Sequence, residues 1–198
     1  MKRKLLVAGW LLVIATAISG IFWYNDWRYS LPTPIPQNYQ PVKTGGEIKI
    51  SWALNRDSAK PLFLHFFNPD CPCSKFNVNH FKSLVKEYQG RVNFAIVVMS
   101  SQPCSIKDIQ QRFETSIPVY ADSAIAAACG VIATPQAAII DARHRLWYRG
   151  NYNRSRYCTD KKTEYAKAAL DALLQHENII YEPLAVTAYG CQLPKCTR

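Results

Sequence analysis

The chain has 198 residues, of which 48% are hydrophobic and 19% are charged. This length and composition suit one hydrophobic core with an appendage, and they exclude a disordered chain, a collagen-like fibre and a large multi-domain machine. The formal net charge is +10, and the first 30 residues contribute +3 of it, four basic residues against one acidic residue, which leaves +7 for the rest. Beyond the N-terminal tip this excess is spread along the chain, which predicts a basic surface suited to acidic partners. It comes without a nucleic-acid-binding motif, so we expect no nucleic-acid partner.

The N-terminus predicts a membrane anchor. Residues 5–24 (LLVAGWLLVIATAISGIFWY) carry no charge, and at about 1.5 Å per residue a helix of this length crosses a hydrocarbon core of roughly 30 Å. The basic residues 2–4 precede it, so the positive-inside tendency keeps the N-terminus in the cytoplasm and places the rest of the chain outside. The alternative is a cleaved signal peptide, because Ala15-Thr16-Ala17 fits a small-x-small cleavage site. Cleavage there would leave residues 18–24 as an apolar tail, which favours the retained anchor.

Three regions are expected after the basic cytoplasmic tip and transmembrane anchor of residues 1–24. Residues 25–46 contain four prolines and a Gly-Gly pair, a composition that predicts a stiff, extended tether without core-forming periodicity. Residues 47–180 carry the hydrophobic patterning of a folded domain. Residues 181–198 form a tail with two cysteines and no clear period.

The first half of the domain predicts strands that alternate with a helix. The segment 47–54 alternates as a peripheral strand would, whereas 61–67 and 92–98 are nearly continuous apolar runs, as in strands buried on both faces. Between these runs, apolar residues recur every three or four positions from 76 to 88, which predicts a helix that ends near Gly90. This β-α-β order predicts a parallel pair with a right-handed crossover.

The second half predicts a hairpin and a closing helix. Strands over 135–141 and 145–150 are joined by only three residues, a connection that forces an antiparallel hairpin. A helix over 161–175, with Asp160 as its N-cap, closes the domain. The fold class is therefore α/β, with a central mixed sheet flanked by helices. Shorter elements are expected as helices over 105–113 and 123–129 and a strand over 117–120.

Seven cysteines lie on the side of the anchor that is predicted to be outside the cytoplasm, where disulfides persist. Because seven is odd, at least one thiol is free, pairs between molecules or takes part in exchange. The seven are Cys71, Cys73, Cys104, Cys129, Cys158, Cys191 and Cys196.

The segment Asp70-Cys71-Pro72-Cys73-Ser74 is the candidate site. Cys71 falls where a buried strand turns into a helix, and Pro72 suits the first helical position because its missing N–H would have no partner there. As N-cap residue, Cys71 would meet unsatisfied N–H groups and the positive end of the helix dipole, which lower the pKa of its thiol and favour the attacking thiolate. A bond between Cys71 and Cys73 would close a small, strained and easily reduced ring. The alternative is that both are structural thiols or partners of distant cysteines.

The chain resembles the thioredoxin-like and redoxin proteins over about residues 48–176, in particular the membrane-anchored extracytoplasmic thiol-disulfide oxidoreductases. Three features carry the resemblance: FLHFFNPDCPCSKF, the segment 130–135 that leads into PQAAIID, and the hairpin 141–148. The resemblance implies a nucleophilic Cys71 and a cis proline at Pro135. It also implies that Thr134 and Pro135 hold the extended chain of a substrate in a mixed disulfide.

The sequence departs from that family's C-x-x-C pattern, because Cys73 falls inside the spacer and Ser74 occupies the resolving position. The resolving thiol is then either Cys73 or a distal cysteine. Cys191 is the distal candidate, since its Gly-Cys context is similar to the tail of some redoxin-like proteins with C-P-x-S sites. Cys196 is a weaker candidate, and a simple bond between Cys191 and Cys196 is the structural alternative. No pattern assigns the remaining cysteines, although Cys129 is expected to be a buried, inert thiol.

Two other activities and an inert module compete with exchange. A peroxiredoxin-like peroxidase would by resemblance need Thr or Ser three residues before its cysteine, and Asn68 and Asp70 stand there instead. A copper-handling carrier would use Cys71, Cys73 and His80, because thiolates select Cu(I) and His80 follows on the same helical face. We prefer His80 as a boundary residue of the apolar stripe, and His65 as a strand residue with a satisfied hydrogen bond. In the inert module, the cysteines would be oxidised into staples.

We therefore expect a thiol-disulfide oxidoreductase that reduces, oxidises or isomerises disulfides in exported proteins, through Cys71 resolved by Cys73 or Cys191. Its expected partners are exported proteins with thiols or disulfides, and a membrane or periplasmic redox protein that recharges the site. Neither an organic cofactor nor a bound metal is expected, since exchange needs only an attacking thiolate, an accessible sulfur and a suitable leaving group. The expected location is the bacterial cytoplasmic (inner) membrane, with one span and the domain on the periplasmic or extracytoplasmic side.

Overall fold

The computed structural model describes residues 2–37, 39–51, 57 and 59–194. It divides into two compact units, one up to Pro32 and one from Thr33 onward.

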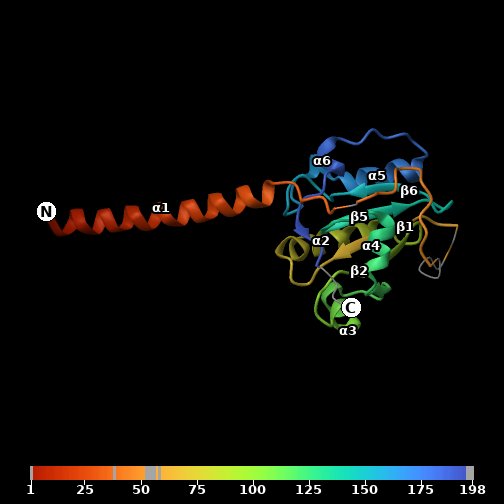
Figure 1. Cartoon of the computed structure of the whole chain (residues 1–198), viewed down its shortest axis with the longest axis horizontal. Helices are drawn as coiled ribbons and strands as arrows, with labels where there is room; N and C mark the ends of the chain where they lie inside the picture. Colours follow the sequence, from red (N-terminus) through yellow and green to blue (C-terminus); the bar gives the residue numbers. More distant parts are fainter. Residues whose placement is uncertain (1, 38, 52–56, 58, 195–198) are drawn as a thin grey trace. The chain divides into compact units, whose positions relative to one another are not determined.

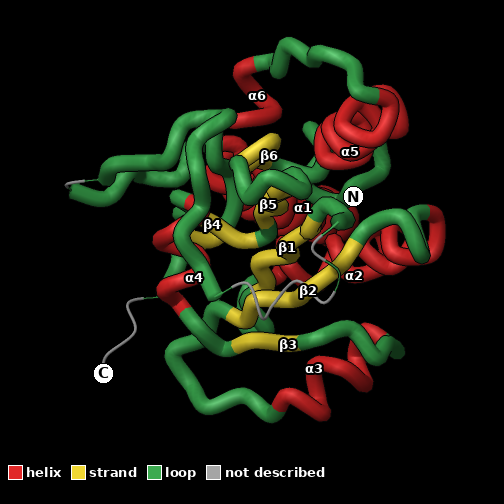
Figure 2. The backbone as a smooth tube through the Cα atoms, turned by 90° about the vertical axis from the view of Figure 1, so that its right-hand side faces the viewer, coloured by secondary structure: helices red, strands yellow, loops and turns green. Residues whose placement is uncertain are grey.

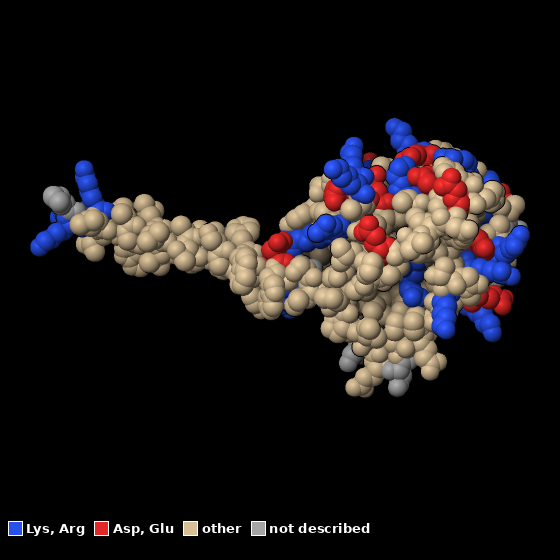
Figure 3. All heavy atoms as spheres, turned by 90° about the horizontal axis from the view of Figure 1, so that it is seen from above, with Lys and Arg blue, Asp and Glu red and all other residues tan. Residues whose placement is uncertain are grey.

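The first unit is a single long helix, α1 (Lys2–Ser30). Within the described residues it is the helix long and apolar enough to cross a membrane, with a mean hydropathy of 2.3 and no part of its apolar window buried. Figure 3 shows basic side chains at its N-terminal tip and a long stretch without charge after them. The helix continues six residues beyond the anchor expected to end at Tyr24. It ends before Pro32, because a proline disfavours the helical conformation of the residue that precedes it.

The structure differs from the expected stiff, extended tether of residues 25–46 in two respects. Its first six residues are helical, and its later part packs against the folded domain. Thr33 is buried, and its N–H donates to the carbonyl oxygen of Ala188 over 2.8 Å. The hydroxyl of Tyr39 donates to the carbonyl oxygen of Gly130. Composition predicted the extended backbone but not these long-range hydrogen bonds.

The second unit is built on a five-stranded sheet in the order β3-β2-β1-β5-β6 (Figures 1 and 2). β1 (Leu62–Phe67) pairs in parallel with β2 (Asn93–Val98), and β2 pairs in parallel with β3 (Val119–Tyr120). On its other side β1 pairs antiparallel with β5 (Gln136–Ile140), which pairs antiparallel with β6 (Leu146–Gly150). The expected mixed sheet, with a parallel half and an antiparallel hairpin, is confirmed.

The central strand β1 is apolar on both faces because the sheet separates two hydrophobic cores. Phe63 and Phe67 belong to one core, and Leu64 and Phe66 belong to the other. This alternation follows from the two-residue period of a strand, whose successive side chains point to opposite faces. All six residues of β1 are buried, so the end of the strand is held firmly where the chain turns into the candidate site.

Helices that flank the sheet contribute further residues to these two cores (Figure 2). Residues of α2 (Pro72–Glu87), α3 (Ile106–Phe113) and α5 (Tyr165–Gln175) pack in the first core, and residues of α4 (Ser123–Cys129) pack in the second. The expected helices at the places of α2, α3 and α4 are confirmed, with small shifts of their ends. The start of α4 is held by the carboxylate of Asp122, which accepts from the N–H of Ala124 over 2.8 Å.

Three expectations need correction. The segment 47–54 is not a strand over its described part: Glu47 makes an isolated bridge with Arg145, and residues 52–54 lie outside the described residues. The closing helix is interrupted, because Lys161–Thr163 is a 3₁₀ turn and α5 begins only at Tyr165. Asp160 does act as a cap, but of the 3₁₀ turn, where its carboxylate accepts from the N–H of Lys162 over 3.0 Å.

The tail, for which no period was recognised, contains two short elements. They are α6 (Pro183–Val186) and β7 (Cys191–Gln192). β7 pairs antiparallel with β4 (Ala133–Thr134) and forms a separate two-stranded sheet. The tail thus returns to the segment that precedes Pro135.

Candidate functional site

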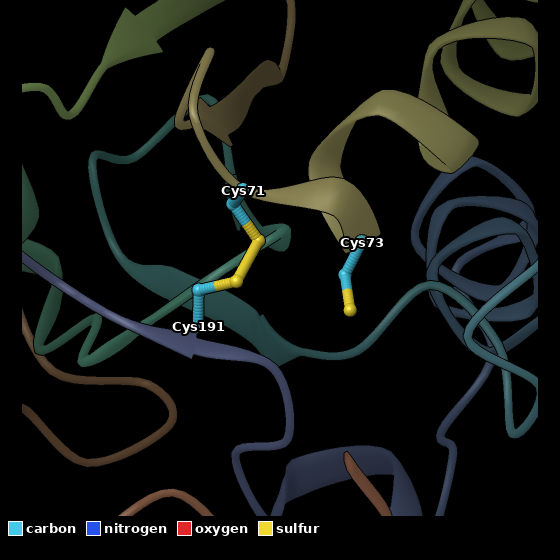
Figure 4. Close-up of side chains that lie close together, drawn as sticks. All are labelled: Cys71, Cys73 and Cys191. Carbon is cyan, nitrogen blue, oxygen red and sulfur yellow. A yellow bond between two sulfur atoms is a disulfide. The ribbon is translucent and has the colours of Figure 1, made fainter. Parts of the chain in front are cut away.

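Cys71 occupies the position predicted for it, at the start of α2. It is the N-cap residue, with extended backbone (φ −85°, ψ 120°), and Pro72 is the first helical residue. Its side chain makes no capping hydrogen bond. Instead, its sulfur is joined to the sulfur of Cys191 in a disulfide that spans 120 residues of sequence (Figure 4). Of the two candidate partners of Cys71, the bond is therefore made with the distal Cys191 and not with Cys73.

The tail reaches Cys71 by lying along the strand that precedes Pro135. In the pairing of β4 with β7, Cys191 is the partner of Thr134, and Gln192 is the partner of Ala133. Gly190 makes this approach possible, because a Cβ at its position would lie 2.4 Å from the carbonyl oxygen of Thr134. Its φ of +128° is also a conformation that residues with a side chain rarely adopt. Glycine is therefore required beside Cys191 for two independent reasons.

The Thr134–Pro135 peptide bond is cis, as expected by resemblance. The carbonyl oxygen of Thr134 lies 3.5 Å from the sulfur of Cys71, so this segment faces the start of α2. Gln136 supports the approach to it, since its side-chain oxygen accepts from the N–H groups of Ile132 and Ala133 over 3.3 and 3.4 Å. Thr134 is fully buried, and its hydroxyl has no hydrogen-bond partner among the described residues.

Exposure differs between the two bonded cysteines. Cys71 is buried, with 2% of its surface exposed, whereas Cys191 is of intermediate exposure. Cys191 is therefore the more accessible of the two residues to an incoming thiolate. Its attack there would release Cys71, whose thiolate would be stabilised by the N–H groups at the helix start.

Cys73 lies beside the disulfide as a free, buried thiol. The sulfurs of Cys71, Cys73 and Cys191 all lie within 4.8 Å of one another (Figure 4). Burial raises the pKa of the Cys73 thiol, and the positive charge of Arg156 opposes this rise. Ser74, at the position that matches the usual resolving cysteine, serves the backbone instead: its hydroxyl accepts from the N–H of Asn68 over 3.3 Å.

A second free thiol, Cys158, lies close to the same part of α2. The side-chain N–H of Asn77 donates to its sulfur over 3.0 Å, and Asn77 itself is fully buried. Burial raises the pKa of Cys158 to about 11, partly opposed by this hydrogen bond. Sequence reasoning did not place Cys158 near the site, because the loop that carries it has no periodicity. Its distance of 81 residues from Asn77 along the chain gives no local signal either.

The other cysteines lie apart from this cluster. Cys129 is fully buried, and burial raises the pKa of its thiol to about 12, as expected for an inert core thiol. Cys104 is free and half-buried, and burial raises its pKa. Cys196 lies outside the described residues. The alternative bond between Cys191 and Cys196 is wrong for this structure, because Cys191 is joined to Cys71.

Neither histidine considered in the sequence joins the sulfur cluster as a ligand. Among the described residues, the close group of ligand-type side chains around Cys71 consists of the three cysteines and does not include His80. His80 Nδ1 instead lies 3.8 Å from a carboxylate oxygen of Glu164, and burial lowers the pKa of its imidazole. His65 is fully buried, and its Nδ1 is 2.6 Å from the hydroxyl of Tyr152. The copper site of Cys71, Cys73 and His80 is therefore not assembled.

Comparison with protein families gives one match. A family model described as "Domain of unknown function (DUF6436)" covers residues 44–194. No curated protein matches the chain.

Comparison with solved structures shows the fold. An uncharacterized conserved protein from Geobacillus kaustophilus is 19% identical, with a TM-score of 0.62, over 81% of this chain and 97% of that one. A hypothetical protein from Sinorhizobium meliloti 1021 is 20% identical, with a TM-score of 0.61, over 84% of this chain and 94% of that one. A solution structure of a thioredoxin-like protein in the oxidized form is 17% identical, with a TM-score of 0.50, over 74% and 98% of the two chains. The fold of the domain is thioredoxin-like.

Proposed function

The chain belongs to the DUF6436 family, and we propose that its domain carries out thiol-disulfide exchange with exported proteins outside the bacterial cytoplasmic membrane. Cys71 is the nucleophile and Cys191 resolves the mixed disulfide. The observation that carries the proposal is the Cys71–Cys191 disulfide at the start of α2, facing the cis Thr134–Pro135 bond.

The exchange cycle follows from the two sulfurs. In the reduced protein, the thiolate of Cys71 attacks one sulfur of a substrate disulfide, and the other substrate sulfur leaves as a thiolate. Cys191 then attacks the Cys71 sulfur, which releases the second substrate thiol and leaves the bond seen in the structure. The substrate gains two electrons and the protein loses them. The same steps in reverse oxidise a substrate dithiol, and a redox partner restores the starting state.

The tail strand occupies the place that the resemblance assigns to a substrate. β7 lies antiparallel to β4, with Cys191 opposite Thr134. An extended substrate segment would make the same backbone pairing with Thr134 while its cysteine is bonded to Cys71. Substrate and tail would thus alternate at one strand edge, and the strand pairing would bring Cys191 back to resolve the mixed disulfide.

The location is proposed from α1. Its length and hydropathy fit one membrane span, and its basic residues 2–4 favour a cytoplasmic N-terminus. The domain would then face the periplasm or extracytoplasmic space, where disulfides persist. Its partners there would be exported proteins with thiols or disulfides, and a membrane or periplasmic redox protein.

Trapping tests the roles of the two cysteines. In the full chain in detergent, Cys73→Ser/Cys191→Ser should accumulate a mixed disulfide between Cys71 and a labelled peptide disulfide, because both thiols that lie close to the Cys71 sulfur are removed. The expected yield is at least tenfold above that of wild type and of Cys71→Ser. Cys129→Ser, which removes a buried thiol outside the cluster, is the matched control and should behave as wild type. Trapping by Cys73→Ser alone, or equal trapping by Cys71→Ser and Cys73→Ser/Cys191→Ser, would overturn the assignment.

The three neighbouring sulfurs favour a second candidate, which is binding of Cu(I) by the reduced protein. Soft thiolates select Cu(I), and the sulfurs of Cys71, Cys73 and Cys191 already lie within 4.8 Å of one another. Anaerobic titration with Cu(I) against a coloured chelator would test it. A carrier would bind one equivalent, lose it in Cys191→Ser, retain it in His80→Gln and show little exchange activity. Failure to compete with the chelator would exclude this candidate.

A further inference from the structure

We propose that Cys73 and Cys158 form a second redox pair, which accepts the disulfide from Cys71 and Cys191 by internal exchange. The proposal deepens the exchange reaction proposed above, and its role in the protein rests on that reaction. The transfer itself has its own test. Three spatial relationships carry the proposal. The first is the closeness of the Cys73 sulfur to the Cys71–Cys191 bond, the second is the position of Cys73 and Asn77 on one face of α2, and the third is the hydrogen bond from Asn77 to Cys158.

Cys73 lies next to the existing disulfide. Its sulfur lies within 4.8 Å of the sulfurs of both Cys71 and Cys191 and is bonded to neither. Figure 4 shows Cys71 and Cys73 at the start of the same helix, with the Cys73 sulfur beside the bond and not turned away behind the ribbon. A small change of side-chain rotamer would bring this sulfur to either of its neighbours.

Cys158 lies against α2 one helical turn beyond Cys73, at the level of Asn77. Cys73 and Asn77 are four residues apart in α2, so they lie on the same face with about 5–6 Å between their Cβ atoms. Both are buried, and the Asn77 side chain reaches the sulfur of Cys158 over 3.0 Å. Cys158 is therefore held against the helical face that carries Cys73.

The loop around Cys158 is fixed to α2 by further contacts. The rings of Phe76 and Tyr157 lie 4.8 Å apart, which joins the residue before Cys158 to the first turns of the helix. The N–H of Cys158 donates to the carbonyl oxygen of Ser155 over 2.9 Å. Asn153 closes the loop, since its side chain donates to the carbonyl oxygen of Asp160 over 2.6 Å. These contacts preorganise Cys158 beside the helix.

The proposed transfer needs no external oxidant. The thiolate of Cys73 attacks the sulfur of Cys191, the Cys71–Cys191 bond breaks, and Cys71 leaves as a thiolate at the helix start. The thiolate of Cys158 then attacks the sulfur of Cys73 and releases Cys191. One disulfide remains throughout, and the two protons lost by Cys73 and Cys158 are taken up by Cys71 and Cys191. The result is a Cys73–Cys158 disulfide and two free thiols at the site that meets the substrate.

This transfer gives the buried thiols a function. It would return Cys71 to the reduced, attacking state without removing the oxidising equivalent from the protein. The oxidising equivalent would move to Cys158, in the loop that packs against the first turns of α2. A redox partner would then act on Cys158, which is less buried than Cys73.

The first measurement uses the double variant Cys71→Ser/Cys191→Ser of the full chain in detergent, oxidised with glutathione disulfide. Acid quenching, alkylation and peptide mapping should find a Cys73–Cys158 disulfide in most chains. Cys104 and Cys129 remain in this variant and serve as internal controls, since neither should pair. Glutathione adducts on Cys73 or Cys158 without a bond between them, or a bond from Cys73 to Cys129, would overturn the proposal.

The second measurement uses the wild-type chain with its Cys71–Cys191 disulfide, held without oxygen or added thiol and quenched over time. A Cys73–Cys158 disulfide should appear in at least about 5% of chains, with an equal number of free Cys71 and Cys191 thiols. Cys158→Ser should abolish it, whereas Cys129→Ser should not. Its absence from the wild type at every time point would overturn the transfer, even where the double variant forms the bond.

Exchange with the peptide disulfide is measured on the same proteins, so that the two proposals fail separately. Cys158→Ser should keep single-turnover exchange through Cys71 and Cys191 within twofold of wild type, because neither sulfur is removed. Loss of peptide exchange in wild type, together with internal formation of Cys73–Cys158, would reject the proposed function and keep the second redox pair. Normal peptide exchange without any Cys73–Cys158 bond would keep the proposed function and reject the second redox pair.

Discussion

Gly190 lies so close to Thr134 that a Cβ on Gly190 would be 2.4 Å from the Thr134 carbonyl oxygen. This contact sets the distance between the tail and the segment before Pro135, and Cys191 is the next residue along the tail. Gly190→Ala should therefore push the tail away from the start of α2. The equilibrium constant for closing the Cys71–Cys191 disulfide should fall about 5- to 150-fold, since local strain of this kind costs about 1–3 kcal/mol. Titration with a dithiothreitol redox buffer and alkylation of the free thiols measures it.

Gly90→Ala is the matched control for this substitution. Gly90 also has a positive φ, +81°, but a Cβ there would meet no heavy atom within 4 Å. In both variants the new side chain strains a backbone with positive φ. Only the side chain at position 190 would also collide with Thr134. Gly90→Ala should leave the disulfide equilibrium unchanged. An equal effect of both variants would show that strand contact at Gly190 does not control the disulfide.

Asn151 anchors the tail before it reaches the site. Its side-chain N–H group donates to the carbonyl oxygens of Leu184 and Thr187 over 2.8 and 2.6 Å, and its side-chain oxygen accepts from the N–H of Tyr189 over 3.4 Å. Asn151→Ala should cost about 2–3 kcal/mol of unfolding free energy, at roughly 1 kcal/mol for each buried hydrogen bond lost. It should also slow resolution by Cys191, because the tail would be held less firmly beside Cys71.

Asn153→Ala is the comparison for Asn151→Ala, since Asn153 is similarly buried but its side chain bonds to Ser155, Asp160 and Thr163 and not to the tail. Denaturant unfolding should show a loss of stability in both variants. Rapid-quench trapping should show a longer-lived mixed disulfide in Asn151→Ala alone. A mixed disulfide with the same lifetime in both variants would count against the anchoring role of Asn151.

The sequence predicts the framework of the fold because long apolar runs and helical spacing are strong local signals. The buried strands β1 and β2, the helix α2 and the hairpin of β5 and β6 all have such patterns, and each lies close to its expected range. Cys71 at the helix start was predictable for the same reason, since Pro72 marks the first turn. The interruption of the closing helix at Glu164 was not predictable, because a continuous pattern of apolar residues does not reveal a 3₁₀ turn before α5.

The parts of the candidate site that sequence reasoning missed depend on contacts between distant segments. β4 and β7 have two residues each, too few for any period, so only the resemblance of Gly190-Cys191 to other tails pointed to this pairing. Cys158 stands in a loop with a positive φ of 55°. Asn77, which contacts it, is 81 residues away along the chain. Such contacts follow from tertiary packing, and spacing along the chain contains no record of them.

Internal transfer of the disulfide should be faster at higher pH. Burial raises the pKa of Cys73, so at neutral pH most of its thiol is protonated and only the small thiolate fraction attacks. Below the pKa this fraction rises about tenfold for each pH unit, and the transfer rate should rise nearly as steeply between pH 6 and pH 8. Acid-quenched peptide mapping over time measures the rate. A rate that does not change over this range would show that deprotonation of Cys73 is not part of the step.

The charged groups around Cys73 supply a control for this pH dependence. Arg156 lowers the pKa of Cys73, while Cys73 and Glu164 both raise the pKa of Cys158. Arg156→Gln should therefore slow transfer at pH 7, because the pKa of Cys73 rises further when the positive charge is removed. Acceleration by this variant would contradict the electrostatic role of Arg156.

His65 should make the domain less stable as the pH falls from 6.5 toward 3. It is fully buried against Phe81, with 4.4 Å between the ring centroids, and burial lowers the pKa of its imidazole to about 3, with His80 acting in the same direction. An unfolded histidine has a pKa near 6.5, so between these values the unfolded chain binds a proton that folded His65 does not. Stability therefore rises with pH in this window and is lost on acidification, by at most about 1.4 kcal/mol per pH unit from this group.

His65→Gln tests this dependence, because glutamine keeps a polar partner for the hydroxyl of Tyr152 and removes the titrating ring. Denaturant unfolding of the full chain in detergent at pH 7, 6 and 5 should give a flatter pH dependence for the variant than for wild type. Burial also lowers the pKa of His80. Because both proteins contain His80, the difference between their pH slopes reports on His65. His176→Gln, at an exposed position after α5, should keep the slope of the wild type. If His65→Gln and wild type lose stability equally on acidification, the buried imidazole does not account for the acid sensitivity.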